Sequence, residues 1–139
     1  MQDRTKKLPL WVEYGEIYLD WLLGAGDGSH PTKPIRAKNA VAKLVERLKG
    51  SIVVHDPALD ADVEADKIEL AKVHGEALIH AAVDNYVDSQ WGGSNEKVAR
   101  AGLAMFRGTV RAVRALLAGK ARVAFNPQGA KHHAMRDNS

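Results

Sequence analysis

Cysteine is absent from the 139 residues of this chain. Its absence excludes disulfides, thiolate nucleophiles and Cys-based zinc or iron–sulfur sites, so a zinc site would need His, Asp or Glu ligands. No apolar run is long enough to span a membrane. Arg4, Lys6 and Lys7 precede a short apolar run, but Glu13 interrupts it, and the pattern is too brief for a signal peptide. We therefore expect a cytoplasmic protein with no membrane partner.

Acidic side chains are almost missing from the last third of the chain. Residues 1–50 hold nine basic and six acidic side chains, residues 51–96 hold two and ten, and residues 97–139 hold nine and one. The length and the 45% hydrophobic content fit one globular domain over residues 1–139. We expect the acidic and basic blocks to face each other, or solvent, in the folded domain, the alternative being an acidic or nucleic-acid partner.

Three short runs rich in strand-forming residues alternate with helical patterns. The predicted strands are residues 8–14, 51–55 and 121–125. A helix opened by Pro34 and closed before Gly50 lies between the first two, and residues 64–86 read as helical, in two pieces broken near Gly75. Strands that alternate with helices predict an α/β fold with a parallel sheet and crossover helices.

The strongest helical pattern covers residues 95–118. Its larger apolar side chains recur at steps of three and four and predict a single core-facing stripe. The stripe consists of Ala99, Leu103, Phe106, Val110, Val113 and Leu117. Arginines at 100, 107, 111 and 114 share a neighbouring face, which could grip phosphates but is more often solvated.

The segment over residues 125–134 has the composition of a catalytic loop. It contains the tandem pair His132 and His133, and imidazole titrates near neutral pH and can transfer protons. The pair follows the carboxyl end of a predicted parallel strand, which is where open α/β sheets place their sites. Two other histidines, His74 and His80, are six residues apart, so they do not share a helix face as metal ligands would.

Over nearly its full length the chain resembles the amino-terminal part of the histone deacetylase family, including its bacterial acetoin-utilisation-type members. The matching segments, in order, are residues 14–18, His30-Pro31-x-x-Pro34-x-Arg36, Val73-His74-Gly75-Glu76-Ala77-Leu78-Ile79, the Ala- and Gly-rich helix from Asn95, and Gly129-Ala130-Lys131-His132-His133-Ala134. The last resembles the family signature Gly-x-x-His-His-Ala. The resemblance implies a partial arginase/deacetylase-like domain of about three strands.

The resemblance also implies roles for three residues. His132 and His133 would form the dyad that handles protons, with His133 as general base and His132 as its electrostatic partner, and Arg36 would line an internal channel. In the family a zinc-bound water attacks an acyl-lysine amide, and a tyrosine stabilises the oxyanion. The family's Asp-x-His and later aspartate, which hold the zinc, and that tyrosine are absent from this sequence. Zinc is therefore expected only with a second chain, and no cofactor with this chain alone.

Two hypotheses of different classes follow. The first is the amino-terminal half of a zinc-dependent deacetylase of acyl-lysine or related amides, inactive alone and completed by a second chain. The alternative is a non-catalytic structural or interaction module that reuses the deacetylase scaffold within a larger assembly. Either would need a second polypeptide, or further copies of this chain, to cover the exposed sheet. Nucleic-acid binding through the arginine face is a weaker third hypothesis.

Overall fold

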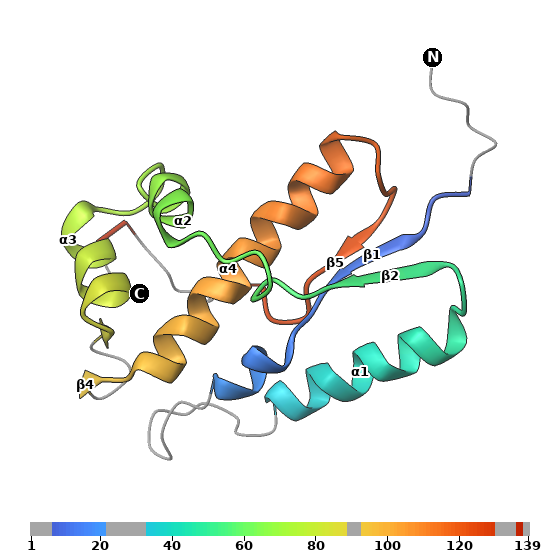
Figure 1. The fold of residues 1–139 in the computed structure, drawn as a ribbon, viewed down its shortest axis with the longest axis horizontal. Coiled ribbons are helices and arrows are strands. Elements are labelled where there is room, and N and C mark those ends of the chain that lie inside the picture. Colours follow the sequence, from blue (N-terminus) through green and yellow to red (C-terminus); the bar gives the residue numbers. More distant parts are fainter. Residues whose placement is uncertain (1–6, 22–32, 89–92, 130–135, 138–139) are drawn as a thin grey trace.

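A three-stranded parallel sheet is the centre of this mixed α/β structure, a computed structural model that describes residues 7–21, 33–88, 93–129 and 136–137 (Figure 1). The strands are β1 (Leu10–Glu13), β2 (Ile52–His55) and β5 (Ala124–Phe125), in the order β2-β1-β5. β1 pairs in parallel with both neighbours. The three predicted strands and their parallel arrangement are confirmed.

Two long helices lie on opposite sides of this sheet (Figure 1). α1 (Lys33–Arg47) connects β1 to β2, and α4 (Glu96–Leu117) precedes β5. From β1 the chain crosses to β2 on one side, and from β2 it crosses back past β1 to β5 on the other side. Both crossovers are right-handed, and because they run in opposite directions across the sheet their helices lie on opposite faces. α1 buries Pro34, Ala37 and Val41. The predicted crossover helix is thus confirmed.

α4 is confirmed as a helix, but its buried face is not the predicted one. Most of its core-facing side chains are small, namely Ala101, Ala104, Gly108, Ala112 and Ala115, and Met105 packs beside them in the core cluster with Tyr18. By the helical period the small residues lie roughly opposite the predicted stripe, of which Ala99 is buried but Val113 and Leu117 are exposed. The prediction was wrong because α4 approaches the sheet closely: a Cβ added at Gly108 would come within 2.6 Å of Tyr18 Oη. At Gly108 there is no room for a side chain.

Short elements fill the connections. A 3-10 helix, η1 (Glu16–Asp20), follows β1. The segment before α4 contains α2 (Val63–Leu70), α3 (Glu76–Ile79), the π-helical turn η2 (His80–Asp84) and the antiparallel pair β3 (Val87–Asp88) and β4 (Gly93–Ser94). The predicted break near Gly75 falls between α2 and α3. None of the helices in the described ranges has the length and apolarity needed to cross a membrane.

The acidic middle block and the basic last block face each other across α2 and α4. Three pairs join them: Arg107 with Asp66, Arg111 with Asp60 at 2.9 Å, and Arg114 with Glu69 at 2.7 Å. The predicted pairing of the blocks is confirmed. The expectation that the arginine face is solvated is wrong for Arg107. Its guanidinium is buried, and Asp66 and a backbone carbonyl accept its hydrogen bonds.

Candidate functional site at the carboxyl ends of the strands

The carboxyl ends of β1 and β5 form the switch point of this sheet. β1 is followed by a connection to one face, whereas β5 is reached from a helix on the other face. Open α/β sheets bind ligands outside the carboxyl ends of adjacent strands at such a reversal. Residues 13–18 and 126–129 meet there, so this edge is the first place to look for a site.

A hydrogen-bonded network ties the two strand ends together beneath α4. Tyr18 Oη donates to Asn126 Oδ1 at 3.1 Å, and Asn126 Nδ2 donates to Met105 O at 3.0 Å and to Thr109 Oγ1 at 3.1 Å. Both ends of the Asn126 amide are engaged, which fixes its orientation. Burial raises the pKa of the Tyr18 phenol, so this group remains a donor at neutral pH.

The network also fixes the start of the predicted catalytic loop. The hydroxyl of Thr109, on α4, donates to the backbone carbonyl of Gly129 at 2.9 Å. Gly129 stands three positions before His132. This contact therefore holds Gly129, the last described residue before the histidine pair, against α4 at the switch point.

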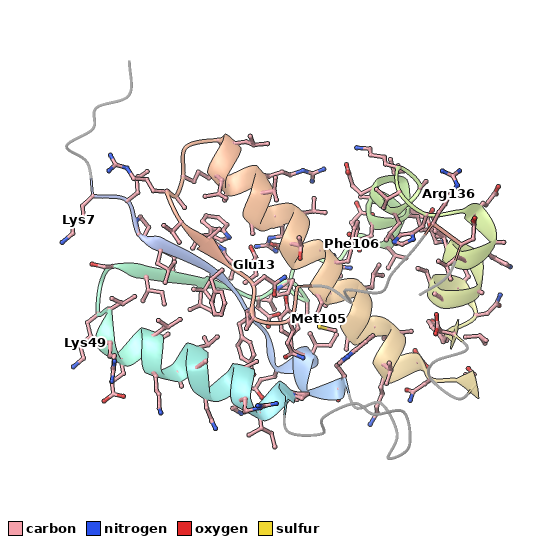
Figure 2. The ribbon with its side chains drawn as sticks, turned by 180° about the vertical axis from the view of Figure 1, so that it is seen from behind. Lys7, Glu13, Lys49, Met105, Phe106 and Arg136 are labelled. Atoms are coloured by element: carbon pink, nitrogen blue, oxygen red, sulfur yellow. The ribbon has the colours of Figure 1, made fainter. Side chains whose placement is uncertain are left out.

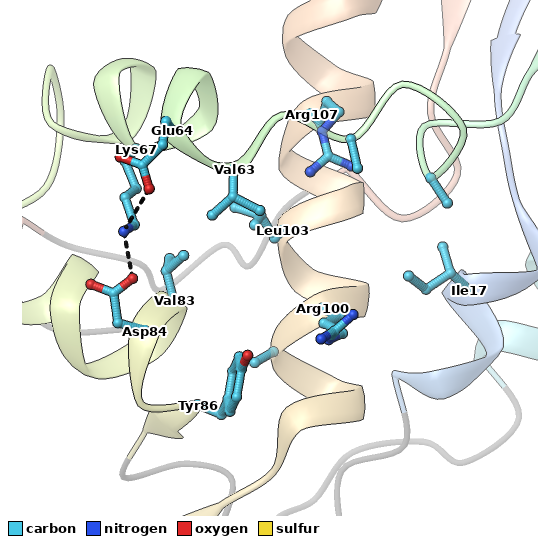
Figure 3. Close-up of a pocket in the computed structure, with 13 residues that line it drawn as sticks. Ile17, Val63, Glu64, Lys67, Val83, Asp84, Tyr86, Arg100, Leu103 and Arg107 are labelled. Atoms are coloured by element: carbon cyan, nitrogen blue, oxygen red, sulfur yellow. Dashed lines mark hydrogen bonds and ion pairs between the residues drawn. The ribbon is translucent and has the colours of Figure 1, made fainter.

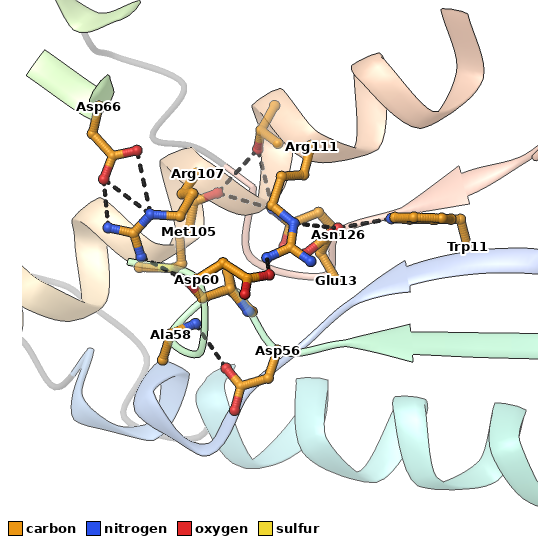
Figure 4. Close-up of polar contacts among 12 residues, drawn as sticks. Trp11, Glu13, Asp56, Ala58, Asp60, Asp66, Met105, Arg107, Arg111 and Asn126 are labelled. Atoms are coloured by element: carbon orange, nitrogen blue, oxygen red, sulfur yellow. Dashed lines mark hydrogen bonds and ion pairs between the residues drawn. The ribbon is translucent and has the colours of Figure 1, made fainter. Parts of the chain in front are cut away.

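Glu13 is a fully buried carboxylate at the end of β1, between the strands and α4 (Figure 2). Its Oε1 accepts a hydrogen bond from Trp11 Nε1 at 2.7 Å and lies 3.5 Å from Arg111 Nε (Figure 4). Removal from water raises the pKa of Glu13, and the Trp11 and Arg111 contacts oppose that rise. A carboxyl group in this state can gain or lose a proton nearer neutral pH than a surface glutamate can.

Four buried side-chain atoms in the described part of the chain lack a hydrogen-bond partner there. They are Glu13 Oε2, Tyr14 Oη, His55 Nε2 and Gln128 Oε1. Each belongs to the end of a parallel strand or to the segment just after it. Buried polar atoms are normally satisfied, so a cluster of unsatisfied ones calls for a missing partner. The carboxyl edge of the sheet is therefore where the buried polar groups of the described structure gather.

His55, at the end of β2, stacks on Trp11 with ring centroids 3.7 Å apart. Burial, followed by the nearby Arg111 charge, lowers the pKa of this imidazole. His55 is consequently neutral at physiological pH. It was not selected as a site residue from the sequence, since nothing in a short apolar run shows that its last residue stacks on the neighbouring strand.

The segment after β2 is anchored by a buried ion pair (Figure 4). Arg107 Nε donates to Asp66 Oδ2 at 2.9 Å, and Arg107 Nη1 donates to Pro57 O at 2.6 Å. The guanidinium thus joins α4 to α2 and to the turn between β2 and α2. This pair holds the acidic segment against the strand ends.

Of the three site residues predicted from the sequence, the structure describes only Arg36. His132 and His133 lie outside the described residues. The chain is held again beyond them, because Gly75 N donates to Arg136 O at 2.8 Å. Arg36 is exposed near the start of α1, so its channel role remains a prediction that requires another surface to cover it.

A cavity of about 490 Å³ opens between α4, α2 and η2 (Figure 3). Its apolar lining includes Ile17, Val63, Val83 and Leu103. At its rim Lys67 Nζ lies 3.1 Å from Glu64 Oε1 and 2.5 Å from Asp84 Oδ1. The hydrogen bond to Asp84 raises the pKa of Lys67, so the ammonium stays charged. The sequence did not predict this cavity, because its walls come from distant segments.

No protein-family model, no curated protein and no solved structure matches this chain. Function must therefore be argued from the site itself. Within the described ranges, no three His, Asp or Glu side chains are grouped so that they could hold a metal ion. The polar side chains at the strand ends suit hydrogen bonding and proton transfer. They are one glutamate, two tyrosines, a histidine and two amides.

Proposed function

We propose that this chain is the amino-terminal half of a histone-deacetylase-like amidohydrolase acting on acyl-lysine or related amides. It supplies His132 and His133 to a site that a second polypeptide completes. The observation that best supports the proposal is the hydrogen bond from Thr109 to the carbonyl of Gly129, which starts the histidine loop at the switch point of the sheet. In this proposal His133 accepts and returns a proton, and His132 stabilises the charge that develops on its neighbour.

The open edge of the sheet supports a second polypeptide. Within the described structure β5 pairs only with β1, and a docked chain can pair with the backbone groups on its other side. The metal and the oxyanion-stabilising group belong to the second polypeptide in this proposal, because the family's zinc ligands and tyrosine are absent from the sequence. Arg36 would line a channel only once that polypeptide covers α1.

The test is hydrolysis of an acetyl-lysine peptide by the complex purified through a tag on this chain. We expect the complex to release acetate and the isolated chain to be inactive. His133→Ala should lower the rate by about 100-fold or more, because a positioned general base contributes on that scale. His80→Ala, at an exposed histidine on η2, is the matched control and should leave the rate unchanged. Equal activity of the complex with His133→Ala would contradict the proposal.

A second candidate function is a non-catalytic interaction module within a larger assembly. The observation that favours it is the exposure of large apolar side chains, including Leu117 and Val123, which can serve binding without any chemistry. This function predicts that replacing both His132 and His133 by Ala leaves the assembly and its role intact. The acetate assay separates the two candidates.

A further inference from the structure

The cavity between α4, α2 and η2 has the size and the lining of a small-molecule site. Its volume of about 490 Å³ falls within the range of ligand pockets, about 300–1,000 Å³. Its apolar walls come from several elements, with Val63 on α2, Val83 on η2, Leu103 on α4 and Ile17 on η1 (Figure 3). Ligand pockets typically combine such walls with a few polar groups that orient the bound molecule.

Two unusual backbone features adjoin this cavity. η2 has the hydrogen bonding of a π-helix, with Asn85 N donating to His80 O at 3.2 Å, and such turns occur often at functional sites. Tyr86, the second residue after η2, has a φ of 59°. For a bulky side chain this left-handed backbone is an outlier that persists only where the surroundings enforce it. Val83 and Tyr86 line the cavity, so both features border the same space.

The strained backbone at Tyr86 places a phenol in the lining of the cavity. Asn95 N donates to Tyr86 O at 2.8 Å, which ties the strained residue to the start of α4. In Figure 3 the ring stands between Asp84 and Arg100. Glycine or asparagine would adopt this φ at a lower cost, so what a tyrosine adds here is the phenol itself.

Two polar groups of the lining can still donate a hydrogen bond to a ligand. The ammonium of Lys67 has three N–H groups, and two of them are engaged by Glu64 at 3.1 Å and Asp84 at 2.5 Å. Arg100 donates to the phenol oxygen of Tyr86, and no described residue accepts the phenol O–H in turn. Both groups therefore suit a ligand that carries an acceptor oxygen.

The charges of the lining are already paired with one another or with neighbours. The pairs are Lys67 with Glu64 and Asp84, Arg100 with Glu96, and Arg107 with Asp66. A charged ligand would have to break one of these pairs or lie unpaired against apolar side chains, and either is costly. An uncharged ligand leaves every pair intact, so the lining favours one.

We propose that this cavity binds an uncharged, mainly apolar small molecule with a carbonyl oxygen. The apolar body lies against Val63, Val83 and Leu103, and the oxygen accepts a hydrogen bond from the phenol of Tyr86, with Lys67 as a second donor at the rim. The inference goes beyond the proposed function and does not depend on it, because Lys67 and Tyr86 lie outside the strand ends and the histidine loop.

Fluorescence titration of the purified full chain with two naphthalene probes tests the proposal. Prodan is an uncharged naphthyl ketone, and anilinonaphthalene sulfonate carries a negative charge. We expect Prodan to bind at a single saturable site with blue-shifted emission. The sulfonate should bind about tenfold more weakly or worse, because its charge would lie unpaired. No saturable binding of Prodan, or equal binding of the two probes, would overturn the proposal.

Substitutions in the walls show whether the probe occupies this cavity. Leu103→Trp and Val83→Phe fill it from α4 and from η2, and each should weaken Prodan binding by about tenfold or more, because the probe and the added side chain compete for one space. Circular dichroism checks that each variant is folded. Val113→Phe, at an exposed position of α4 outside the lining, is the control and should leave binding unchanged. Unchanged binding in the folded filling variants would overturn the proposal.

Two substitutions of Tyr86 separate ligand binding from a structural role. Tyr86→Phe keeps the ring and removes the donor, so Prodan binding should weaken by about threefold to tenfold, whereas Tyr14→Phe, outside the cavity, should not change it. Tyr86→Asn relieves the strained φ, so binding should weaken by about tenfold or more while the urea midpoint stays at or above that of the wild type. Unchanged binding in Tyr86→Phe, or a lower urea midpoint with unchanged binding in Tyr86→Asn, would overturn the proposal.

Discussion

Tyr18 Oη donates a hydrogen bond of 3.1 Å to Oδ1 of Asn126, a residue 108 positions later in the chain. This contact joins the segment after β1 to the segment after β5. Both segments belong to the switch point, so the geometry of the candidate site depends on a bond between residues that are distant in sequence.

We predict that Tyr18→Phe lowers the free energy of unfolding by about 1–3 kcal/mol, because Asn126 Oδ1 would lose its donor in a partly buried place. Tyr14→Phe is the matched control, since the Tyr14 hydroxyl is buried and lacks a described partner. Its removal should be neutral or stabilising. Urea unfolding of both variants measures the difference, and equal losses for the two would contradict the role given to the Tyr18 bond.

Gly108→Ala should destabilise the protein by about 1–3 kcal/mol through overpacking. The added Cβ would lie 2.6 Å from Tyr18 Oη and 3.0 Å from Asn126 Nδ2. Helix propensity alone would favour alanine by about 1 kcal/mol, so the sign of the change is informative. In the Tyr18→Phe background the closest contact is gone, and the cost of Gly108→Ala should shrink. A stabilising Gly108→Ala would show that α4 does not approach the sheet as described.

Arg107→Met should lower the free energy of unfolding by about 3–5 kcal/mol, because Asp66 would be left as an unpaired buried charge. Replacing Asp66 by Leu in the same chain should recover much of this loss, since both charges are then removed. Arg114→Met, at an exposed ion pair with Glu69, is the control and should have a much smaller effect. Thermal and urea unfolding of the wild type, Arg107→Met, Asp66→Leu and the double variant measures the coupling.

The raised pKa of Glu13 makes the stability of the folded protein depend on pH. Burial raises the pKa of this carboxyl above its ordinary value of 4.5, so the folded protein binds its proton more tightly than the unfolded chain does. The contribution of Glu13 is therefore fully present below pH 4.5 and is lost as the pH rises through the raised pKa.

Glu13→Gln, which keeps an acceptor for Trp11, should not show this loss. As the pH rises from 4 to 7, the free energy of unfolding of the variant should therefore increase relative to that of the wild type. A difference that is constant over this range, in urea titrations at fixed ionic strength, would contradict the raised pKa.

The sequence predicted the architecture better than the packing. The strands, both long helices and the break near Gly75 follow from local patterns of apolar residues, proline and glycine. The face of α4 was predicted wrongly, because large apolar side chains at helical spacing normally mark the core. Here Tyr18 and Asn126 occupy the space beneath Gly108, and only small residues fit above them.

The candidate site could be predicted only in part. The loop bearing His132 and His133 has a local composition that indicates chemistry, and its strand was found. Glu13 was read only as an interruption of an apolar run, although a glutamate between Val12 and Tyr14 in a predicted strand is a signal for a buried charge. Arg111, which lies beside Glu13, and the partners of Tyr18 and Arg107 come from distant segments, and no local pattern reveals them.

Native mass spectrometry of the protein purified from its own source tests the central claim most directly, because one spectrum reads the partner chains and any bound zinc. The account predicts a one-to-one complex with a different polypeptide that carries zinc. A zinc-free homo-oligomer, or a complex with unrelated large proteins, would contradict it and leave a repurposed scaffold.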